Sequence, residues 1–234
     1  MSVDKKLLII VPAFNEEKNI PAVVQDLSEN IPGCDILIIN DCSLDNTSIV
    51  AKGLGRVKVV DLPCNLGIGG AVQTGFMFAK RYGYDYAVQV DGDGQHIATE
   101  VKKLISVMEN CQCDMVIGSR FLDTKSFTTT RARRAGIGLF YYLYRVLLKI
   151  KVTDSTSGFR AYNRRSIEYL SNNYPDDYPE PEAVVMLKKN GFNICEVGVL
   201  MRERIHGKSS ITPVKSMYYM LKVVLSIFFS YLRN

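Results

Sequence analysis

An alternation of apolar runs and helical segments constrains the fold of this 234-residue chain more than any other feature. Five short runs are consistent with buried strands, because their apolar residues follow one another without the alternation of a half-exposed strand. They cover Leu7–Val11, Asp35–Asn40, Val57–Asp61, Tyr86–Val90 and Asp114–Gly118. Uninterrupted apolar strands are typical of a parallel sheet that is covered on both faces.

Segments with helical spacing lie between these strands: Glu16–Asn30, Asp45–Leu54, Ile68–Tyr82 and Thr99–Asn110. This order predicts an α/β fold with a mostly parallel sheet flanked by helices. The second half is less regular, with an apolar and aromatic run at 137–150, a predicted helix at Glu182–Lys189 and a predicted strand at Asn193–Val199. We expect residues 1–212 to form one domain and residues 213–234 to form a C-terminal amphipathic helix.

Ligands of such sheets bind beyond the carboxyl ends of the strands, so the loops after the predicted strands are the first candidates. Three of these loops are Pro12–Glu17, Asn40–Thr47 and Asn65–Gly70. Taken singly, each is explained by helix capping or turn chemistry. The glycines of the third loop allow close approach to a ligand, but they do not follow the first strand, as a dinucleotide fingerprint would.

The fourth loop, Asp91-Gly-Asp-Gly-Gln-His96, gives the sharpest signal. Two carboxylates, Asp91 and Asp93, leave a buried strand together. Divalent cations with a preference for hard oxygen ligands bind such pairs and link them to a diphosphate. The pattern therefore predicts a Mg²⁺ or Mn²⁺ site, with an ordinary polar turn as the alternative.

Positive charge is concentrated in two stretches of a chain whose net charge is +5. Residues 125–165 hold ten Lys and Arg with one acidic residue, and residues 202–234 hold six with one. Together the two stretches carry +14 and the remainder carries −9. This asymmetry indicates a surface for phosphates, anionic lipid or nucleic acid, with solvated helix faces as the alternative. Because no RNA- or DNA-binding motif accompanies the charge, we expect no nucleic-acid partner.

The cysteines predict no metal site, because no Cys/His set has the spacing of a zinc site. The N-terminal segment is not expected to be a signal peptide, since its apolar run is short. We therefore expect free thiols in a reducing cytosol. The six cysteines are Cys34, Cys42, Cys64, Cys111, Cys113 and Cys195.

Eight motifs between Val11 and Ser210 together resemble the inverting GT-A glycosyltransferases of family 2, and within them the polyprenyl-phosphate sugar synthases. They are VPAFNEE, NDCSLDNT, NLGIGGAVQTGF, DGDGQH, GSR at 118–120, DSTSGFRAY at 154–162, YPEPE at 178–182 and RIHGKSS at 204–210. The resemblance implies a GT-A fold and a metal-dependent transferase that moves a sugar from a nucleotide-sugar, favoured as a UDP-sugar, to undecaprenyl phosphate for cell-envelope glycan assembly. The alternative is a transferase that extends a capsule or wall polysaccharide on a sugar hydroxyl. A nucleotide-binding regulator without turnover is disfavoured by the intact carboxylate pair and by Arg204.

The resemblance also implies roles for single residues. The residues expected to contact the nucleotide are Pro12, Phe14, Glu16, Asp41, Asn65 and Asp91. Those expected to bind the metal are Asp91, Asp93 and Gln95. Those expected to bind the acceptor phosphate are Arg120, Arg131, Arg133 and Arg134, and a loop with Arg204 and Ser209 is expected to bind the donor diphosphate. The residues expected to act in catalysis are Asp93, Asp154, Arg120 and Arg204. Asn40 departs from the family pattern, which often has Asp there.

The acceptor decides whether the enzyme needs a general base. A lipid phosphate, with a second pKa near ~6, is largely ionised at neutral pH and can attack the sugar without one. The protein then supplies mainly positioning and electrostatic stabilisation. A sugar hydroxyl would require a carboxylate base, for which Asp154, Glu180 and Glu182 are the candidates.

The apolar stretch at 214–232 contains Lys215 and Lys222 and is a poor match to a spanning helix, which needs about 20 mostly apolar residues. We expect an amphipathic helix in the membrane interface, with the protein peripheral on the cytoplasmic face of the cell membrane. A small membrane protein or a homo-oligomer is a candidate additional anchor. The alternative is a helix packed on the domain's own core.

Overall fold

A computed structural model of the chain describes residues 5–122, 138, 141–176, 178–203, 222, 224, 225 and 228. These residues contain a seven-stranded sheet. Its strands are β1 (Leu7–Ala13), β2 (Asp35–Asn40), β3 (Val57–Asp61), β4 (Tyr86–Gln89), β5 (Met115–Ser119), β6 (Arg160–Asn163) and β7 (Ile194–Gly198). Their order is β3-β2-β1-β4-β6-β5-β7, and only β6 runs antiparallel to its neighbours. The predicted α/β fold with a mostly parallel sheet is confirmed.

Helices connect the strands, most of them where the sequence predicts a helix. They are α1 (Ile20–Asn30), α2 (Thr47–Gly53), α3 (Gly67–Arg81), α4 (Ala98–Cys111), α6 (Arg164–Asn173) and α7 (Pro179–Lys189), and residues 141–147 are also helical. Helix α6 was not predicted. Its N-cap is Asn163, whose side chain accepts a hydrogen bond from the amide of Ser166 and so caps the first turn.

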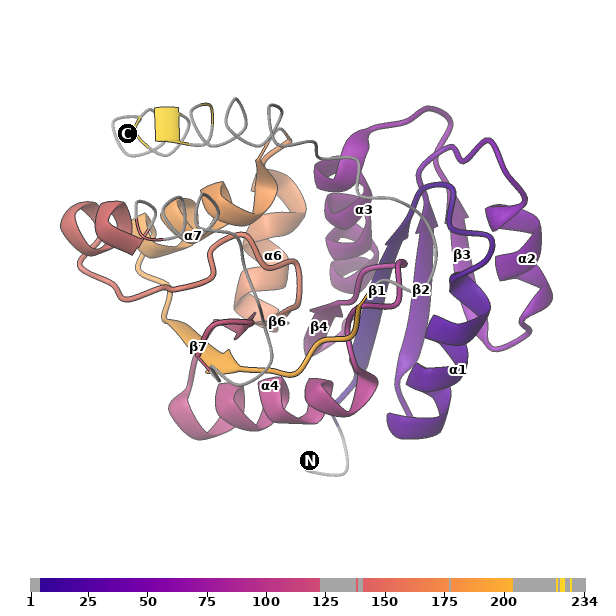
Figure 1. The fold of residues 1–234 in the computed structure, drawn as a ribbon, viewed down its shortest axis with the longest axis horizontal. Helices are drawn as coiled ribbons and strands as arrows, with labels where there is room; N and C mark the ends of the chain where they lie inside the picture. Colours follow the sequence, from indigo (N-terminus) through magenta and orange to yellow (C-terminus); the bar gives the residue numbers. More distant parts are fainter. Residues whose placement is uncertain are drawn as a thin grey trace.

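The sheet is the middle layer of three, and successive strand residues face opposite sides (Figure 1). Leu8 and Ile10 of β1 belong to a core that includes residues of α3, α6 and α7. Leu7 and Ile9 belong to a second core, with residues of α1, α2 and α4. Both sides of β1 are thus buried, which explains why its sequence is apolar without alternation.

Strand β6 is a second element that the sequence patterns missed. It has four residues, begins with a charged side chain, Arg160, and lies inside the sheet between β4 and β5. Because β6 is antiparallel, the residues that precede it, 154–159, lie at the same edge of the sheet as the carboxyl ends of β4 and β5. That edge carries the candidate site.

The predicted C-terminal helix lies mostly outside the described residues, but four of its residues are helical. Val224 packs against the core that contains α3, α6 and α7, whereas Leu225 and Phe228 are about half exposed. Within the described part of the chain, no helix is both long and apolar enough to cross a membrane.

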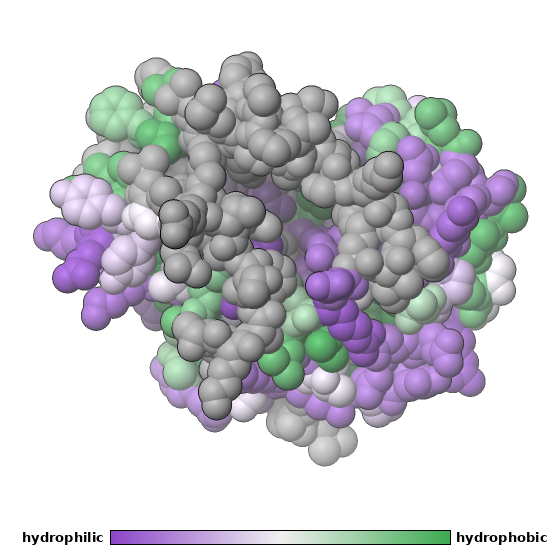
Figure 2. Space-filling view, in the orientation of Figure 1, coloured by the Kyte–Doolittle hydropathy of each residue, from purple (hydrophilic) through white to green (hydrophobic). Residues whose placement is uncertain are grey.

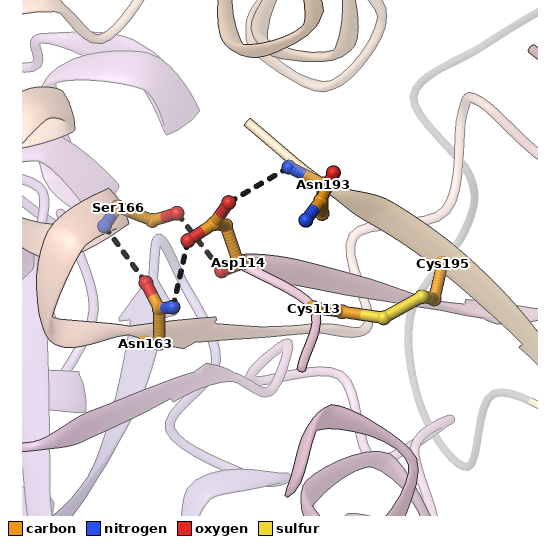
Figure 3. Close-up of a disulfide and its surroundings, with 6 residues drawn as sticks. All are labelled: Cys113, Asp114, Asn163, Ser166, Asn193 and Cys195. Carbon is orange, nitrogen blue, oxygen red and sulfur yellow. Dashed lines mark hydrogen bonds between the residues drawn. A yellow bond between two sulfur atoms is a disulfide. The ribbon is translucent and has the colours of Figure 1, made fainter. Parts of the chain in front are cut away.

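The expectation that all cysteines are free is wrong for one pair. Cys113, just before β5, forms a disulfide with Cys195 of β7, with the two Cα atoms 6.1 Å apart (Figure 3). The neighbouring Asp114 accepts hydrogen bonds from the Asn163 side chain at 2.9 Å and from the Asn193 amide at 2.7 Å. The disulfide and Asp114 therefore hold β5, β6 and β7 together at the edge opposite the candidate site. Cys34, Cys42, Cys64 and Cys111 are free.

We predict that replacing Cys113 and Cys195 together by Ser destabilises the protein. The bond joins positions 82 residues apart, and restricting an unfolded chain over such a loop stabilises a protein by about 4 kcal/mol. Urea unfolding should show a clear loss of stability, whereas Cys111→Ser, at an exposed free thiol, should change little. Alkylation of the denatured but unreduced protein should label four of the six cysteines, and labelling of all six would contradict the bond.

Candidate functional site

The loops after β1 and β2 hold each other in place. The Asn15 amide donates to the Ser43 hydroxyl at 2.9 Å, and the Leu44 amide donates to the Asn15 side chain at 2.8 Å. Strand β1 runs on through the buried Pro12, beyond its predicted end, and the Phe14 side chain is exposed just after it. An aromatic ring in this position is able to stack on a nucleobase. The Glu16 side chain is held locally, because it accepts a hydrogen bond from Asn19 at 2.6 Å.

Asp41 joins the second loop to the third. Its buried carboxylate accepts a hydrogen bond from the Leu66 amide at 2.7 Å, and the Asn65 side chain donates to the Asp41 carbonyl at 3.2 Å. The structure therefore brings Asp41 and Asn65 together, as expected of two nucleotide-binding candidates. One oxygen of Asp41 is already used to position the loop.

The hydrogen bonds of Asn40 explain why an amide stands at this position, where the resembled family often has Asp. Its amide nitrogen donates to the Asp61 carboxylate at 2.8 Å, and its oxygen accepts from the Ser43 amide at 3.2 Å. An Asp at position 40 would place a second negative charge beside Asp61 and would lose the donor. Asn40 thus keeps the loop after β2 attached to the end of β3.

The carboxylate pair lies in a tight turn after β4. Asp91 is partly exposed, whereas Asp93 is buried and accepts a hydrogen bond from the Gln95 amide at 3.1 Å. A Cβ at Gly92 would lie 3.0 Å from the Pro12 carbonyl oxygen, so the turn packs closely on the end of β1. Asp91, Asp93 and Gln95 are therefore next to the loop that carries Phe14.

His96 fixes this turn. Its buried ring stacks on Phe159 with 4.6 Å between ring centroids, and its Nδ1 accepts a hydrogen bond from the Asp91 amide at 3.0 Å. The proton of the neutral ring must then lie on Nε2, which is 3.7 Å from an Asp91 carboxylate oxygen. Burial lowers the pKa of His96, with the charge of Asp91 acting in the opposite direction. A neutral histidine with both nitrogens so placed is suited to orienting Asp91.

The residues of the turn suit a hard divalent cation. Asp91 and Asp93 offer carboxylate oxygens and Gln95 offers an amide oxygen, and such cations prefer ligands of this kind. A Cβ at Gly158 would lie 3.0 and 3.1 Å from the two Asp91 carboxylate oxygens, so this glycine leaves room beside them. The described residues contain no group of three or more His, Cys, Asp and Glu that could hold a metal alone. A cation here would draw its remaining ligands from water or a diphosphate.

Arg120 follows β5 and is locked to Asp154. The Asp154 carboxylate accepts hydrogen bonds from the Arg120 amide at 3.0 Å, from Nε at 2.7 Å and from Nη2 at 2.7 Å. The Arg120 side chain is 14% exposed and that of Asp154 is 0% exposed. Burial lowers the pKa of Arg120, but the bond to Asp154 and the charges of Asp154, Asp91 and Glu180 hold it above its usual value. Arg120 is thus a permanent cation whose charge interacts with the Asp91 carboxylate.

A second arginine, Arg160, shapes the loop that carries Asp154. It is fully buried, and its guanidinium donates to the carbonyls of Ser155 at 2.6 Å, Ser157 at 2.7 Å and Glu180 at 2.7 Å. It therefore ties the 154–158 loop to the first turn of α7. Sequence reasoning missed this role, although a charged residue between apolar ones in a strand was a signal for it.

Five of the expected site residues, Arg131, Arg133, Arg134, Arg204 and Ser209, lie outside the described residues. The chain that leads to Arg204 nevertheless leaves from the carboxylate turn. Met201 forms a β-bridge with His96, and the Arg202 amide donates to the Gln95 carbonyl at 2.8 Å. Figure 2 shows a recessed region near the middle of the molecule's face, with hydrophilic residues at its visible floor.

The fold and this set of loops define a nucleotide-sugar transferase of the GT-A class. Residues 8–170 match the protein family described as Glycosyl transferase family 2, and the chain belongs to that family. It is a glycosyltransferase, as the sequence analysis expected.

Several relatives of known name are similar over most of their length. The UDP-N-acetylglucosamine–dolichyl-phosphate N-acetylglucosaminyltransferase of Methanococcus voltae is 34% identical, over 84% of this chain and 85% of the relative. The polyprenol monophosphomannose synthase of Mycolicibacterium smegmatis is 29% identical, over 94% and 86%. The undecaprenyl-phosphate mannosyltransferase of Micrococcus luteus is 28% identical, over 88% of each.

Solved structures confirm the fold. Glucosyl-3-phosphoglycerate synthase from Mycobacterium tuberculosis, crystallised with Mn²⁺, UDP and phosphoglyceric acid, superposes with a TM-score of 0.73 at 19% identity, over 97% of this chain and 78% of that one. At this identity the likeness concerns the fold alone.

We predict that Gly158→Ala displaces the Asp91 carboxylate. The added Cβ would lie 2.9 Å from the Gln89 amide nitrogen and 3.0 Å from an Asp91 oxygen, so at least one of the two side chains must move. Disturbing a group that supports a metal ligand typically weakens binding by about tenfold or more. Titration of Mn²⁺ followed by electron paramagnetic resonance, in the presence of UDP, should show this loss. Gly53→Ala, where the Cβ meets nothing within 4 Å, is the control, and equal affinities of the two variants would refute the prediction.

Proposed function

We propose that this protein is an inverting synthase of lipid-linked sugars, which transfers a sugar from a UDP-sugar to a polyprenyl phosphate. For a cell-envelope pathway the acceptor is undecaprenyl phosphate. The relatives named above support this reading, because their names pair a sugar transfer with a polyprenyl, undecaprenyl or dolichyl phosphate. The relative with 34% identity has a UDP-sugar as its named donor.

The proposal rests mainly on the buried ion pair between Arg120 and Asp154. Asp154 holds Nε and Nη2 of Arg120, and among the described residues no hydrogen bond involves Nη1. A guanidinium held in this way keeps its orientation and presents a fixed cationic edge, which suits a phosphate. We assign Arg120, with Arg131, Arg133 and Arg134 as further candidates, to the acceptor phosphate.

The proposed reaction needs no general base. An ionised oxygen of the lipid phosphate forms a bond to the anomeric carbon, while the bond from that carbon to the donor's β-phosphate oxygen breaks. The configuration inverts, and the nucleoside diphosphate leaves. Arg120 orients the attacking phosphate, and Arg204 with Ser209 is proposed to approach the leaving diphosphate.

We propose that Asp91, Asp93 and Gln95 hold Mg²⁺ or Mn²⁺, which when bound would neutralise charge on the leaving diphosphate. His96 holds the backbone of Asp91 through the hydrogen bond from its amide, and Phe14 with Pro12, Glu16, Asp41 and Asn65 is proposed to form the nucleotide side of the site. Asp91 lies between these two groups and is proposed to contact either the ribose or the cation.

The alternative acceptor, a glycan hydroxyl, has fewer candidate bases than the sequence suggested. Asp154 is fully engaged by Arg120 and by the backbone, so its oxygens are not open to a hydroxyl. Glu180 is the better candidate, because burial raises its pKa and the charge of Arg160 opposes that rise only in part. Glycan extension would therefore depend on Glu180 or Glu182.

Transfer of radiolabel from UDP-sugars and GDP-mannose to undecaprenyl phosphate tests the proposal. We expect label in the lipid with Mn²⁺, loss of label with EDTA, and a fall of about a hundredfold or more in Asp93→Asn, since an electrostatic contact to the leaving group is lost. Asp85→Asn, at the other end of β4, is the matched control and should stay active. Label that appears only in an oligosaccharide acceptor and disappears in Glu180→Gln would replace this proposal with glycan extension.

We further propose that the protein is peripheral on the cytoplasmic face of the cell membrane, with residues 213–234 as an amphipathic interface helix. A small membrane protein or a homo-oligomer is the proposed additional anchor. The exposed Leu225 and Phe228, next to the packed Val224, support a helix with one face on the domain and another turned outward.

The double substitution Leu225→Ser with Phe228→Ser should reduce binding to anionic lipid vesicles, because apolar area drives interfacial binding. Cosedimentation with vesicles of phosphatidylglycerol and phosphatidylethanolamine measures it. Leu44→Ser removes a leucine that is even more exposed, on the nucleotide side of the molecule, and should leave binding unchanged. Equal binding of the double variant and the parent protein would contradict the assignment of this helix to the membrane interface.

A further inference from the structure

Glu196 is an acidic residue in the middle of β7, within an otherwise apolar and edge-forming strand. Cys195 and Val197 pack on the side of the sheet that α1, α2 and α4 cover, so Glu196 faces the other side. It is not among the residues that the family resemblance placed in the site.

The Glu196 carboxylate accepts a dense set of hydrogen bonds from two consecutive residues. The Thr153 amide donates to both oxygens at 3.0 and 2.8 Å, and the Thr153 hydroxyl donates to Oε1 at 2.8 Å. The Asp154 amide donates to Oε1 at 2.7 Å. Because the Thr153 hydroxyl uses its only proton here, it accepts from the Ser119 hydroxyl, which lies 3.0 Å away. The side chain thus fixes the backbone at the position from which the Asp154 carboxylate projects.

We infer that Glu196 is a positioning residue for Arg120 and acts through Asp154. Glu196 fixes the backbone of Asp154, and Asp154 fixes the guanidinium of Arg120 through two bonds of 2.7 Å. Both links depend on a carboxylate that accepts several hydrogen bonds at once. The inference rests on the proposed function only where it assigns a phosphate to Arg120; the positioning itself does not depend on the substrate.

A glutamine at position 196 has nearly the same shape but replaces one acceptor oxygen with a donor. Its carbonyl oxygen can still accept from the Asp154 amide and the Thr153 hydroxyl. Its NH₂ group would meet the Thr153 amide, which is itself a donor. Glu196→Gln should therefore keep part of the function, and Glu196→Ala, which leaves both amides without this acceptor, should lose more of it.

Nuclear magnetic resonance of the Arg120 side chain tests the positioning directly. In ¹⁵N-labelled protein the Nε–Hε signal of Arg120 is assigned by its loss in Arg120→Lys. A guanidinium held by Asp154 should give a slowly exchanging signal, which should broaden or shift in Glu196→Ala and less so in Glu196→Gln. Glu109→Gln, at the end of α4, is the control. An unchanged Arg120 signal in a folded Glu196→Ala would overturn the inference.

Kinetics then separate positioning from fold stability. We expect Glu196→Ala to raise KM for undecaprenyl phosphate about tenfold, equivalent to one weakened charge-assisted contact, with KM for the UDP-sugar nearly unchanged. Adding Glu196→Ala to Asp154→Asn should have little further effect, since both act on Arg120. A perturbed Arg120 signal with only the donor KM raised would support the positioning and refute the acceptor assignment. If both KM values rise equally and the Arg120 signal is unperturbed, Glu196 has only a structural role.

Discussion

The buried pair of Arg120 and Asp154 is the interaction on which the rest of the site depends. Removing two charges from water is costly, and the cost is offset only where geometry and further hydrogen bonds are good. Here the pair is bidentate, Arg120 also bonds to Thr156 at 3.0 Å, and the loop around Asp154 is fixed by Glu196 on one side and Arg160 on the other. Loss of any one of these groups would leave a buried charge with fewer partners. The 154–158 loop and the Arg120 side chain must therefore become ordered together.

Strand β6 makes this arrangement possible. An all-parallel sheet would send residues 154–159 to the opposite edge, because every strand would then begin there. Running antiparallel between β4 and β5, β6 begins at the edge where those two strands end. Gly158 then meets Asp91, and Phe159 stacks on His96. One reversed strand therefore connects the carboxylate turn of β4 with the arginine of β5.

Much of this was predictable from the sequence, and the remainder has physical reasons for escaping it. Strands β1, β2, β4 and β5 are apolar runs, and burial on both faces makes them readable without a structure. The edge strands β3 and β7 were also predicted, but β3, which was expected to be buried, is only partly so, as is β7. β6 holds only four residues and starts with Arg160, whose charge is satisfied by three carbonyls that no local pattern reveals. The loops that carry Asp91 and Asp41 were predictable because ligand sites follow parallel strands. The bonds from Asp154 to Arg120 and from Glu196 to Thr153 span 34 and 43 residues, and they depend on the order of β5, β6 and β7.

The position of β6 also separates the two charged halves of the site. The carboxylates of Asp91 and Asp93 follow β4, and the cation of Arg120 follows β5, with one strand between them. Two strand spacings amount to about 10 Å, which separates the backbones of the two strand ends. The charge of Arg120 is satisfied by Asp154 from the intervening loop, which leaves Asp91 and Asp93 to other partners. A transferase that must keep an attacking phosphate apart from a leaving diphosphate, with a sugar between them, needs such a spacing.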